Sequence, residues 1–169
     1  IASLIRYKGN VVDIGQVFKD SYPKFKRYAY SLAKGDASAD DLIMEVFKKL
    51  LERQDSIPVD VNIEAYVMRS IRNQFYDFLR KERVLTPMDV VTEEQLADSS
   101  SSSQVSGEST LDMLLKKLDS LGDNCKNVLS LFGLGYSYNQ ISEIEEISAG
   151  TVMSRMARCR EKLLVLYQE

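Results

Sequence analysis

The last helix predicted by this sequence carries two hydroxyl and two guanidinium groups on one face. They belong to Thr151, Ser154, Arg155 and Arg158. In DNA-binding proteins, hydroxyls bond phosphates or base edges, and arginine pairs with guanine or with phosphate. The spacing therefore predicts a face that contacts DNA. A solvated helix face, whose cations only balance nearby acids, gives the same pattern, so both interpretations stay open on the spacing alone.

Local signals place this face in a helix-turn-helix. Ser137 and Gln140 form the S-x-x-Q pattern of a capping box at the start of a short preceding helix. A turn at 146–147 follows, and Ser148 can cap the last helix. The other side of that helix carries apolar residues at helical spacing: Val152, Met156, Cys159, Leu163 and Leu166. This layout is typical of a helix-turn-helix whose second helix enters the major groove.

A second set of polar residues lies on the helix predicted to begin at the cap Asn62. One face of this helix is apolar, and the other alternates cations with an amide and an aromatic ring. The polar face consists of Arg69, Arg72, Asn73, Tyr76, Arg80 and Arg83. The helix predicted before it, over 38–53, has a wide apolar stripe at helical spacing. The polar side of that earlier helix includes Asp41, Met44, Glu45 and Lys48.

These residues belong to two helical modules, residues 1–84 and 111–169. Between them, residues 85–110 hold five acids, no lysine or arginine, and a run of five serines. Such a segment buries too little apolar surface to offset its ordering entropy, so it is predicted to be a flexible acidic linker. Neither module shows strand-like alternation. The predicted fold is therefore all-α, with two small helical domains joined by this linker.

The amino-acid composition excludes some classes of function. The chain has 169 residues, a formal net charge of −3 and no histidine. Histidine-based acid–base catalysis and histidine metal ligands are excluded, and we expect neither an enzyme nor a metal or other cofactor. Residues 1–84 carry 15 basic and 12 acidic side chains, so the first module is mildly basic. The acidic linker offsets this positive charge in the net charge of the whole chain. The sequence shows no apolar run long enough for a membrane span, and we expect a cytoplasmic protein without membrane insertion.

The two cysteines, Cys125 and Cys159, both fall on inward-facing stripes of the second module. Two thiols cannot supply the four ligands of a structural zinc site. A disulfide framework is not expected with so few cysteines, and a reducing cytoplasm fits better. Buried inert thiols are therefore favoured over a redox switch.

Both modules resemble parts of a known family. The segment "LSLFGLGYSYNQISEIEEISAGTVMSRMARCREKL" resembles region 4 of bacterial sigma factors of the extracytoplasmic-function (ECF) group. "ADDLIMEVFKKLLER" resembles the polymerase-binding helix of region 2, and "AYVMRSIRNQFYDFLRKER" its promoter-melting helix. The order of region 2, linker and region 4 covers nearly the whole chain. "LGDNCK" resembles variants in Bacteroidetes-type members.

The resemblance implies a specificity subunit that binds core RNA polymerase and promoter DNA, and that an anti-sigma factor holds inactive. The residues implied in polymerase binding are Asp41, Met44, Glu45 and Lys48. Those implied in capture of the opened −10 element, where bases need stacking surfaces and backbone cations, are Arg69, Arg72, Asn73, Tyr76, Arg80 and Lys81. Those implied in reading the duplex −35 element are Gly150, Thr151, Ser154, Arg155 and Arg158.

The sequence departs from the family pattern at three positions. Glu146 replaces the usual glycine of the helix-turn-helix turn, Ser142 a small alanine, and Met44 a common glutamine. If the turn needs a left-handed residue, glutamate costs on the order of 1 kcal/mol relative to glycine. The turn could also take another shape.

Two other functions remain open on the sequence. A one-component regulator would use the same helix-turn-helix and bind duplex DNA without polymerase, usually at two-fold symmetric sites. The basic helix with its asparagine and tyrosine favours the sigma factor over this regulator. A helical enzyme or pure interaction protein would need a concave polar site, and no acid–base or metal-binding pattern supports one.

Overall fold

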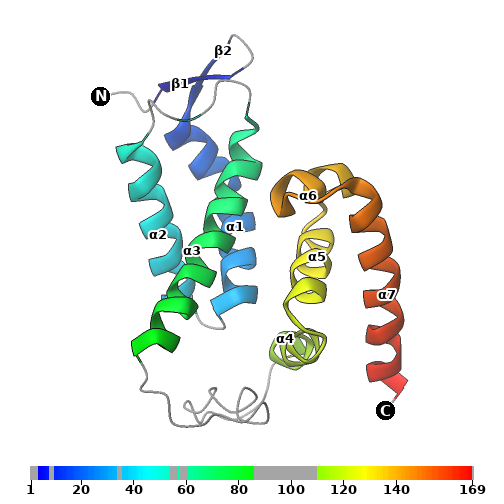
Figure 1. Ribbon diagram of the computed structural model, residues 1–169. Coiled ribbons are helices and arrows are strands. Elements are labelled where there is room, and N and C mark those ends of the chain that lie inside the picture. The colour runs from blue at the N-terminus through cyan, green and yellow to red at the C-terminus, as the bar shows by residue number, and fades with distance from the viewer. Residues whose placement is uncertain are drawn as a thin grey trace.

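The computed structural model describes residues 4–7, 10–33, 36–53, 57, 61–85 and 110–168. Figure 1 shows a short hairpin followed by seven helices over these residues. The hairpin strands are β1 (Leu4–Tyr7) and β2 (Asn10–Asp13). The first module continues with α1 (Ile14–Ala33), α2 (Asp36–Glu52) and α3 (Ile63–Leu85). The second contains α4 (Thr110–Ser120), α5 (Asp123–Gly133), α6 (Tyr138–Glu145) and α7 (Ala149–Gln168).

The predicted helical class is confirmed for both modules, but the hairpin was not predicted. Its strands pair antiparallel, with Leu4 opposite Asp13 and Tyr7 opposite Asn10. Each strand has four residues, which is too short for the alternation of strand residues to stand out in the sequence. The hairpin leads directly into α1 and lies at the end of the first module (Figure 1).

The first module is a bundle of α1, α2 and α3. Its core contains fully buried side chains from all three helices: Phe25, Tyr28, Ile43, Val67, Met68 and Ile71. Helix α1 is one continuous helix of 20 residues with Pro23 inside it. Proline removes one backbone hydrogen bond, but the buried stripe on both sides of Pro23 keeps the helix on the bundle. The predicted cap of α3 is present, because the Asn62 side chain accepts the Ala65 amide.

The second module packs α5, α6 and α7 around a separate set of buried side chains. These are Val128, Leu131, Ile141, Ile144, Val152 and Met156. The predicted capping box is confirmed: Ser137 accepts from the Gln140 amide, and the Gln140 side chain accepts from the Ser137 amide. At the end of α5, Phe132 is 45% exposed, and Leu131 takes the inward position.

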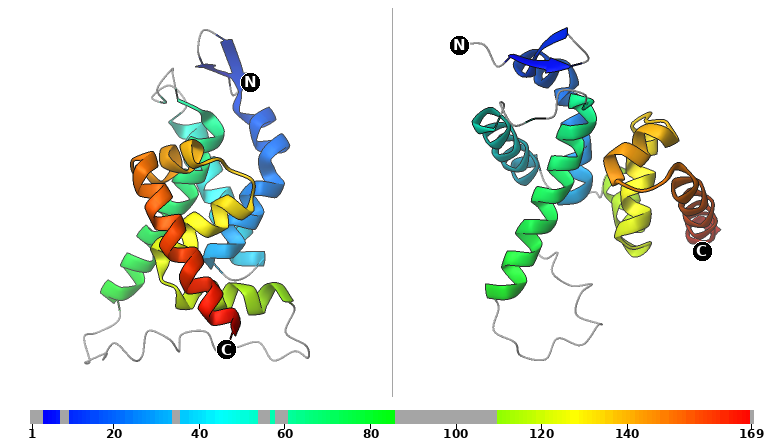
Figure 2. Two further views of the ribbon diagram at one scale, coloured as in Figure 1. Left: turned by 90° about the vertical axis from the view of Figure 1, so that its right-hand side faces the viewer. Right: turned by 45° about the horizontal axis from the view of Figure 1, so that its top comes forward.

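The two modules lie against each other in this structure. Helix α6 is beside α3, and α5 touches α1, in the views of Figures 1 and 2. The predicted linker lies outside the described residues, apart from Leu85 in α3 and Thr110 in α4. Among the described helices, none has the length and apolar character of a membrane span.

Candidate nucleic-acid interface

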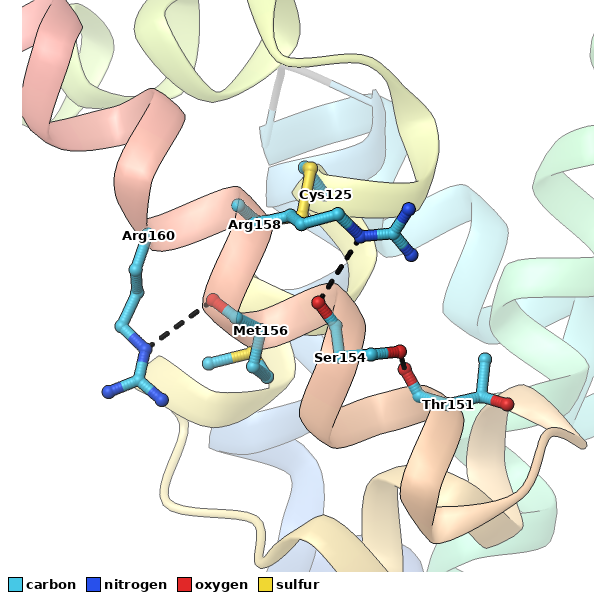
Figure 3. The surroundings of a disulfide bond; sticks show 7 residues. Cys125, Thr151, Ser154, Met156, Arg158 and Arg160 are labelled. Carbon is cyan, nitrogen blue, oxygen red and sulfur yellow. Dashed lines mark hydrogen bonds between the residues drawn. A yellow bond between two sulfur atoms is a disulfide. The ribbon is translucent and has the colours of Figure 1, made fainter.

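The polar face of α7 forms as the spacing predicts. Gly150, Ser154 and Arg158 are exposed, and Thr151 and Arg155 are half-buried. Figure 3 shows Thr151, Ser154 and Arg158 on one side of the helix. The opposite side of α7 presents Val152 and Met156 to the core. The structure thus brings together all five residues predicted for −35 recognition.

Hydrogen bonds within α7 fix the start of this face. Ser148 accepts the Thr151 amide at 3.1 Å, and the two hydroxyls lie 2.8 Å apart. Ser154 donates to the Thr151 carbonyl at 3.0 Å. The Arg158 Nε donates to the Ser154 carbonyl at 3.3 Å, which leaves the outer nitrogens of its guanidinium toward solvent (Figure 3). The predicted cap of this helix, Ser148, is therefore confirmed.

The turn between α6 and α7 is built on a left-handed residue. Glu146 has φ 56° and ψ 38°, and its amide donates to the Ser142 carbonyl. Glutamate is the one non-glycine residue with positive φ among the described residues. Of the two possibilities left open for this turn, the structure has the left-handed one, which costs on the order of 1 kcal/mol relative to glycine.

A disulfide joins α7 to α5, which corrects the prediction of two separate inert thiols. Cys125 and Cys159 are both buried, and their Cα atoms lie 5.3 Å apart. The sequence placed both cysteines on inward stripes, but it could not show that the stripes meet at the same level. The bond lies beside a cavity of about 260 Å³ that is also lined by Arg155, Arg158 and Lys162. The helix that carries the polar face is thus covalently tied to its neighbour.

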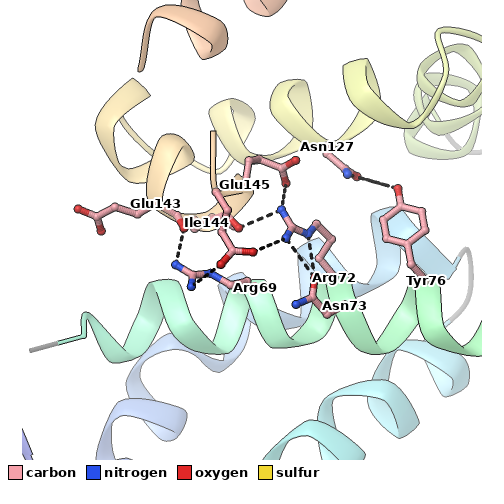
Figure 4. A network of polar contacts seen from close by, with 9 residues as sticks. Arg69, Arg72, Asn73, Tyr76, Asn127, Glu143, Ile144 and Glu145 are labelled. Carbon is pink, nitrogen blue, oxygen red and sulfur yellow. Dashed lines mark hydrogen bonds and ion pairs between the residues drawn. The ribbon is translucent and has the colours of Figure 1, made fainter. Parts of the chain in front are cut away.

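The polar face of α3 is split by the second module. Arg69 and Arg72 point at the C-terminal end of α6, and Tyr76 points at α5 (Figure 4). The side chains of Arg69 and Arg72 are only 24% and 11% exposed. Asn73, Arg80 and Lys81 remain exposed. Of the six residues predicted for −10 capture, three therefore face protein rather than solvent in this arrangement.

Tyr76 is held by an amide of the second module. Its hydroxyl lies 3.4 Å from Oδ1 of Asn127 and 3.3 Å from Nδ2 of the same residue. Burial raises the pKa of Tyr76 to about 12, an effect that the hydrogen bond from Asn127 partly offsets. The ring is therefore neutral at physiological pH.

The residues predicted for polymerase binding gather on the outer side of α2. Asp41, Met44 and Lys48 are exposed, and Glu45 is half-buried and lies 3.6 Å from Lys49. The inner side of the same helix contributes Ile43 and Val46 to the core. Met44 is 55% exposed, which leaves a large apolar side chain among charged neighbours.

Sequence reasoning missed the acidic partners of the α3 arginines. Glu145 and Glu146 form ion pairs with Arg72, and Glu146 also pairs with Arg69. These acids are visible in the sequence as a cluster, but the sequence does not show that they meet the arginines of α3. The signal that could have found the pairing is the match between an acidic cluster in one module and a basic face in the other.

A third contact between the modules has a testable pH dependence. Glu64 of α3 accepts from the Tyr136 hydroxyl and from Lys24. Although burial opposes it, these hydrogen bonds hold the pKa of Glu64 below its ordinary value of 4.5. A lowered carboxyl pKa contributes stability that is present above the unfolded-state value and is lost as the pH falls through the folded-state value.

We therefore expect Glu64→Gln to make the protein less sensitive to acid. Between about pH 6 and pH 3, the free energy of unfolding should fall less in the variant than in the wild type, because one linked carboxyl is removed. Urea unfolding at each pH measures this. Glu161→Gln, an exposed change on α7, serves as the control and should behave like the wild type. Equal acid sensitivity in all three proteins would contradict the role of Glu64.

Comparison with known proteins matches each of the two modules to a known family. Residues 17–84 match the family Sigma-70 region 2, and residues 111–163 match Sigma-70, region 4. The chain is 29% identical over 151 residues to the ECF RNA polymerase sigma factor EcfG of Rhodopseudomonas palustris, covering 85% of this chain and 79% of that protein. It is 25% identical over 142 residues to the ECF RNA polymerase sigma factor SigM of Bacillus subtilis, covering 83% and 86%.

A solved structure shows the same arrangement of helices. The sigma factor RpoE of Bartonella quintana, solved in complex with the anti-sigma factor NepR, superposes with a TM-score of 0.70 and 27% identity. The match covers 91% of this chain and 96% of that one. The two regions occur here in the same order and span most of the helical sequence. The chain therefore belongs to the ECF RNA polymerase sigma factor family.

Proposed function

We propose that this protein binds core RNA polymerase, directs it to specific promoters and helps to melt the −10 element. The observation that carries the proposal is the ordered pair of sigma regions in one chain, with an exposed hydroxyl and arginine face on the helix-turn-helix. No catalytic step is required of the chain. Capture of single-stranded bases can offset an unpairing cost of a few kcal/mol.

The −35 element would be read by α7. With α7 in the major groove, Gly150 and Thr151 lie at the N-terminal end of the recognition helix, where approach to the backbone is closest. Ser154 and Arg155 follow one turn later and can reach base edges. Arg158 presents its outer nitrogens to phosphate.

The −10 element would be held by α3. Tyr76 offers a stacking surface for an extruded base, and Asn73 is exposed beside it. Arg69, Arg72, Arg80 and Lys81 supply backbone cations along the same face. Since α6 and α5 cover part of this face here, the proposed function requires the second module to move away from α3.

Polymerase would dock on the outer side of α2, through Asp41, Met44, Glu45 and Lys48. Met44→Asp is expected to weaken core polymerase binding by roughly tenfold or more, because a charge would replace an apolar anchor at the centre of the patch. Fluorescence titration of labelled sigma factor with core polymerase measures this. Phe132→Asp, at an exposed apolar site on α5, is the matched control and should bind normally. If the two variants bind core polymerase with equal affinity, α2 is not part of the docking surface.

The family relationship supports two further parts of the proposal. An anti-sigma factor would hold the protein inactive, as NepR is bound to the Bartonella sigma factor. The protein would act in the cytoplasm, where polymerase and promoter DNA are found. The "LGDNCK" segment at residues 121–126 supports a place in the Bacteroidetes-type branch.

The test is in vitro transcription with core polymerase, with and without this protein, on a panel of promoters. Start-site-specific transcripts that depend on the protein are the expected result. The free protein should bind promoter duplex poorly in a titration at defined salt. Tight, specific duplex binding without polymerase and no stimulated transcript would instead favour a one-component regulator.

A further inference from the structure

The disulfide between Cys125 and Cys159 lies beside a cavity whose lining is mostly positive (Figure 3). Three cations of α7 line this cavity of about 260 Å³, and Asp123 is the one acid among its described lining residues. The cations are Arg155, Arg158 and Lys162. In the part of the chain that the structure describes, none of the three forms an ion pair. The sulfur atoms therefore lie close to an excess of positive charge.

Cys125 lies in the first turn of α5, where the backbone adds further positive charge. Helix α5 begins at Asp123, and the Cys125 amide donates to the Gly122 carbonyl at 3.0 Å. The N-terminus of a helix is the positive end of its dipole, and its first amides have no acceptor within the helix. Cys159 lies in the middle of α7, away from both ends of that helix. The environment thus favours the thiolate form at Cys125 more than at Cys159.

Both sulfurs are largely covered, and the cavity gives a small molecule a route to them. Cys125 and Cys159 are 7% and 2% exposed, and both line the cavity. A single water molecule needs only about 10–15 Å³ of such space, so hydrogen peroxide, with its two oxygen atoms, has room to enter. Cysteines that react with oxidants combine thiolate character with access. This site provides both.

The packing of α5 on α7 holds the two cysteines at bonding distance. Their Cα atoms lie 5.3 Å apart, close to the usual separation in disulfides. Both helices are fixed by the core of the second module, to which Val128 of α5 and Met156 of α7 contribute fully buried side chains. A thiol on one helix therefore reaches the other without a large movement of the backbone.

We propose that Cys125 and Cys159 form a peroxide-reactive dithiol, in which Cys125 attacks the oxidant and Cys159 then closes the disulfide. The Cys125 thiolate attacks one oxygen of hydrogen peroxide, so an S–O bond forms, the O–O bond breaks and hydroxide leaves. The sulfur is oxidised by two electrons to a sulfenic acid, and the peroxide is reduced. The cations of the cavity stabilise both the thiolate and the hydroxide that leaves.

The second step forms the bond between the two helices. The Cys159 sulfur attacks the Cys125 sulfur, the S–S bond forms, the S–O bond breaks, and the hydroxyl leaves as water with the proton of the Cys159 thiol. A dithiol reductant reverses the outcome, since it restores both protein thiols and is itself oxidised to a disulfide. Because Arg155 and Arg158 line the same cavity, the reaction changes the covalent support of the polar face of α7.

The test follows the reduced full-length protein after addition of hydrogen peroxide at neutral pH, in the absence of polymerase and DNA. Its outcome is thus independent of the proposed function. Free thiols are counted with a chromogenic disulfide reagent, and the mass of the intact chain is measured in parallel. The folded wild type should lose both thiols, with no oxygen added to its mass. This loss should be roughly tenfold faster than in the same protein unfolded in urea, because an ordinary thiol is only a few per cent thiolate at pH 7.

Variants identify the attacking thiol and the role of the cations. Cys159→Ser should accumulate sulfenic acid at Cys125, trapped with dimedone and located by mass spectrometry, whereas Cys125→Ser should trap little. Lys162→Gln should slow the reaction of the wild type about twofold to fivefold, as expected for one exposed charge. Arg160→Gln is the matched control and should react at the wild-type rate. Arg160 lies on the same helix, but its guanidinium bonds the Tyr138 hydroxyl on another side of α7.

Oxidation of the folded wild type no faster than that of the urea-unfolded chain would overturn the proposal, and so would sulfenic acid trapped mainly at Cys159. The first of these results needs no substitution, so it decides the question even if a cysteine variant fails to fold. Circular dichroism at the temperature of the test checks that each variant is folded. Equal rates for Lys162→Gln and Arg160→Gln would contradict the role of the positive lining.

Discussion

Reduction of the disulfide between Cys125 and Cys159 is expected to lower the free energy of unfolding of the second module by roughly 3–4 kcal/mol. The bond closes a loop of 34 residues, and its removal restores the conformational entropy of that loop to the unfolded chain. The loop includes α6 and the first part of α7, so the polar face predicted to contact DNA is stabilised with it. Urea unfolding followed by circular dichroism, with and without reductant, measures the loss.

A variant without the bond provides the control for this prediction. Cys125→Ala/Cys159→Ala should have about the stability of the reduced wild type and should not respond to reductant. Binding to the −35 element should weaken in parallel when reduction is tested near the midpoint of unfolding. If the wild type is equally stable in both redox states, the two cysteines do not stabilise the module through a covalent bond. Because disulfides in reducing compartments are usually transient, the predicted loss on reduction would make the stability of the second module depend on the redox state of the cell.

Replacement of Arg155 and Arg158 by alanine together is expected to weaken holoenzyme binding to a −35 duplex by roughly a hundredfold. Each arginine that pairs with a guanine or a phosphate contributes about 1–3 kcal/mol of binding. Both side chains reach solvent from one face of α7, and neither has an ion-pair partner among the described residues. The slope of log affinity against log salt should fall by about 1, since close to one counterion is released per phosphate contact and Arg158 is the arginine proposed to contact phosphate.

Arg160→Ala is the matched control for the double variant. Arg160 lies on the same helix and carries the same charge, but its guanidinium bonds the Tyr138 hydroxyl at 2.7 Å on another side of α7. Its removal should leave DNA affinity within about twofold of the wild type, because an exposed charge away from the contact acts only through screened, long-range attraction. Equal losses in the two variants would show that net charge, rather than the predicted face, governs binding.

The features that the sequence predicted correctly are those with local causes. The caps at Asn62, Ser137 and Ser148 depend on side chains that bond amides two or three residues away, so their pattern is visible without a fold. The polar face of α7 follows from helical spacing in the same way. The left-handed turn at Glu146 was one of two possibilities left open, and it was raised only by the resemblance, from the glycine usual at that position.

The features that the sequence did not predict depend on which helix surfaces pack against each other. Cys125 and Cys159 lie on different helices, and only the packing of α5 on α7 brings them within bonding distance. Arg72 and Glu145 are 73 positions apart in the numbering, and each looks like an ordinary solvated charge in its own helix. The position of Leu131 inside and Phe132 outside is likewise set by the rotation of α5 on its neighbours. Tertiary packing decides which of these side chains is buried or paired, so the periodicity of the sequence alone cannot predict it.

We propose that polymerase moves the two modules apart and so places α3 and α7 on two promoter elements. The most direct test is the distance between probes at Asp77 on α3 and Glu161 on α7, both exposed, introduced as unnatural amino acids so that the disulfide is kept. We expect a single short distance between the probes in the free protein. In the promoter-bound holoenzyme, we expect a distance approaching the roughly 70 Å that separates elements two helical turns apart. The same short distance in a holoenzyme that initiates transcription would contradict this proposal.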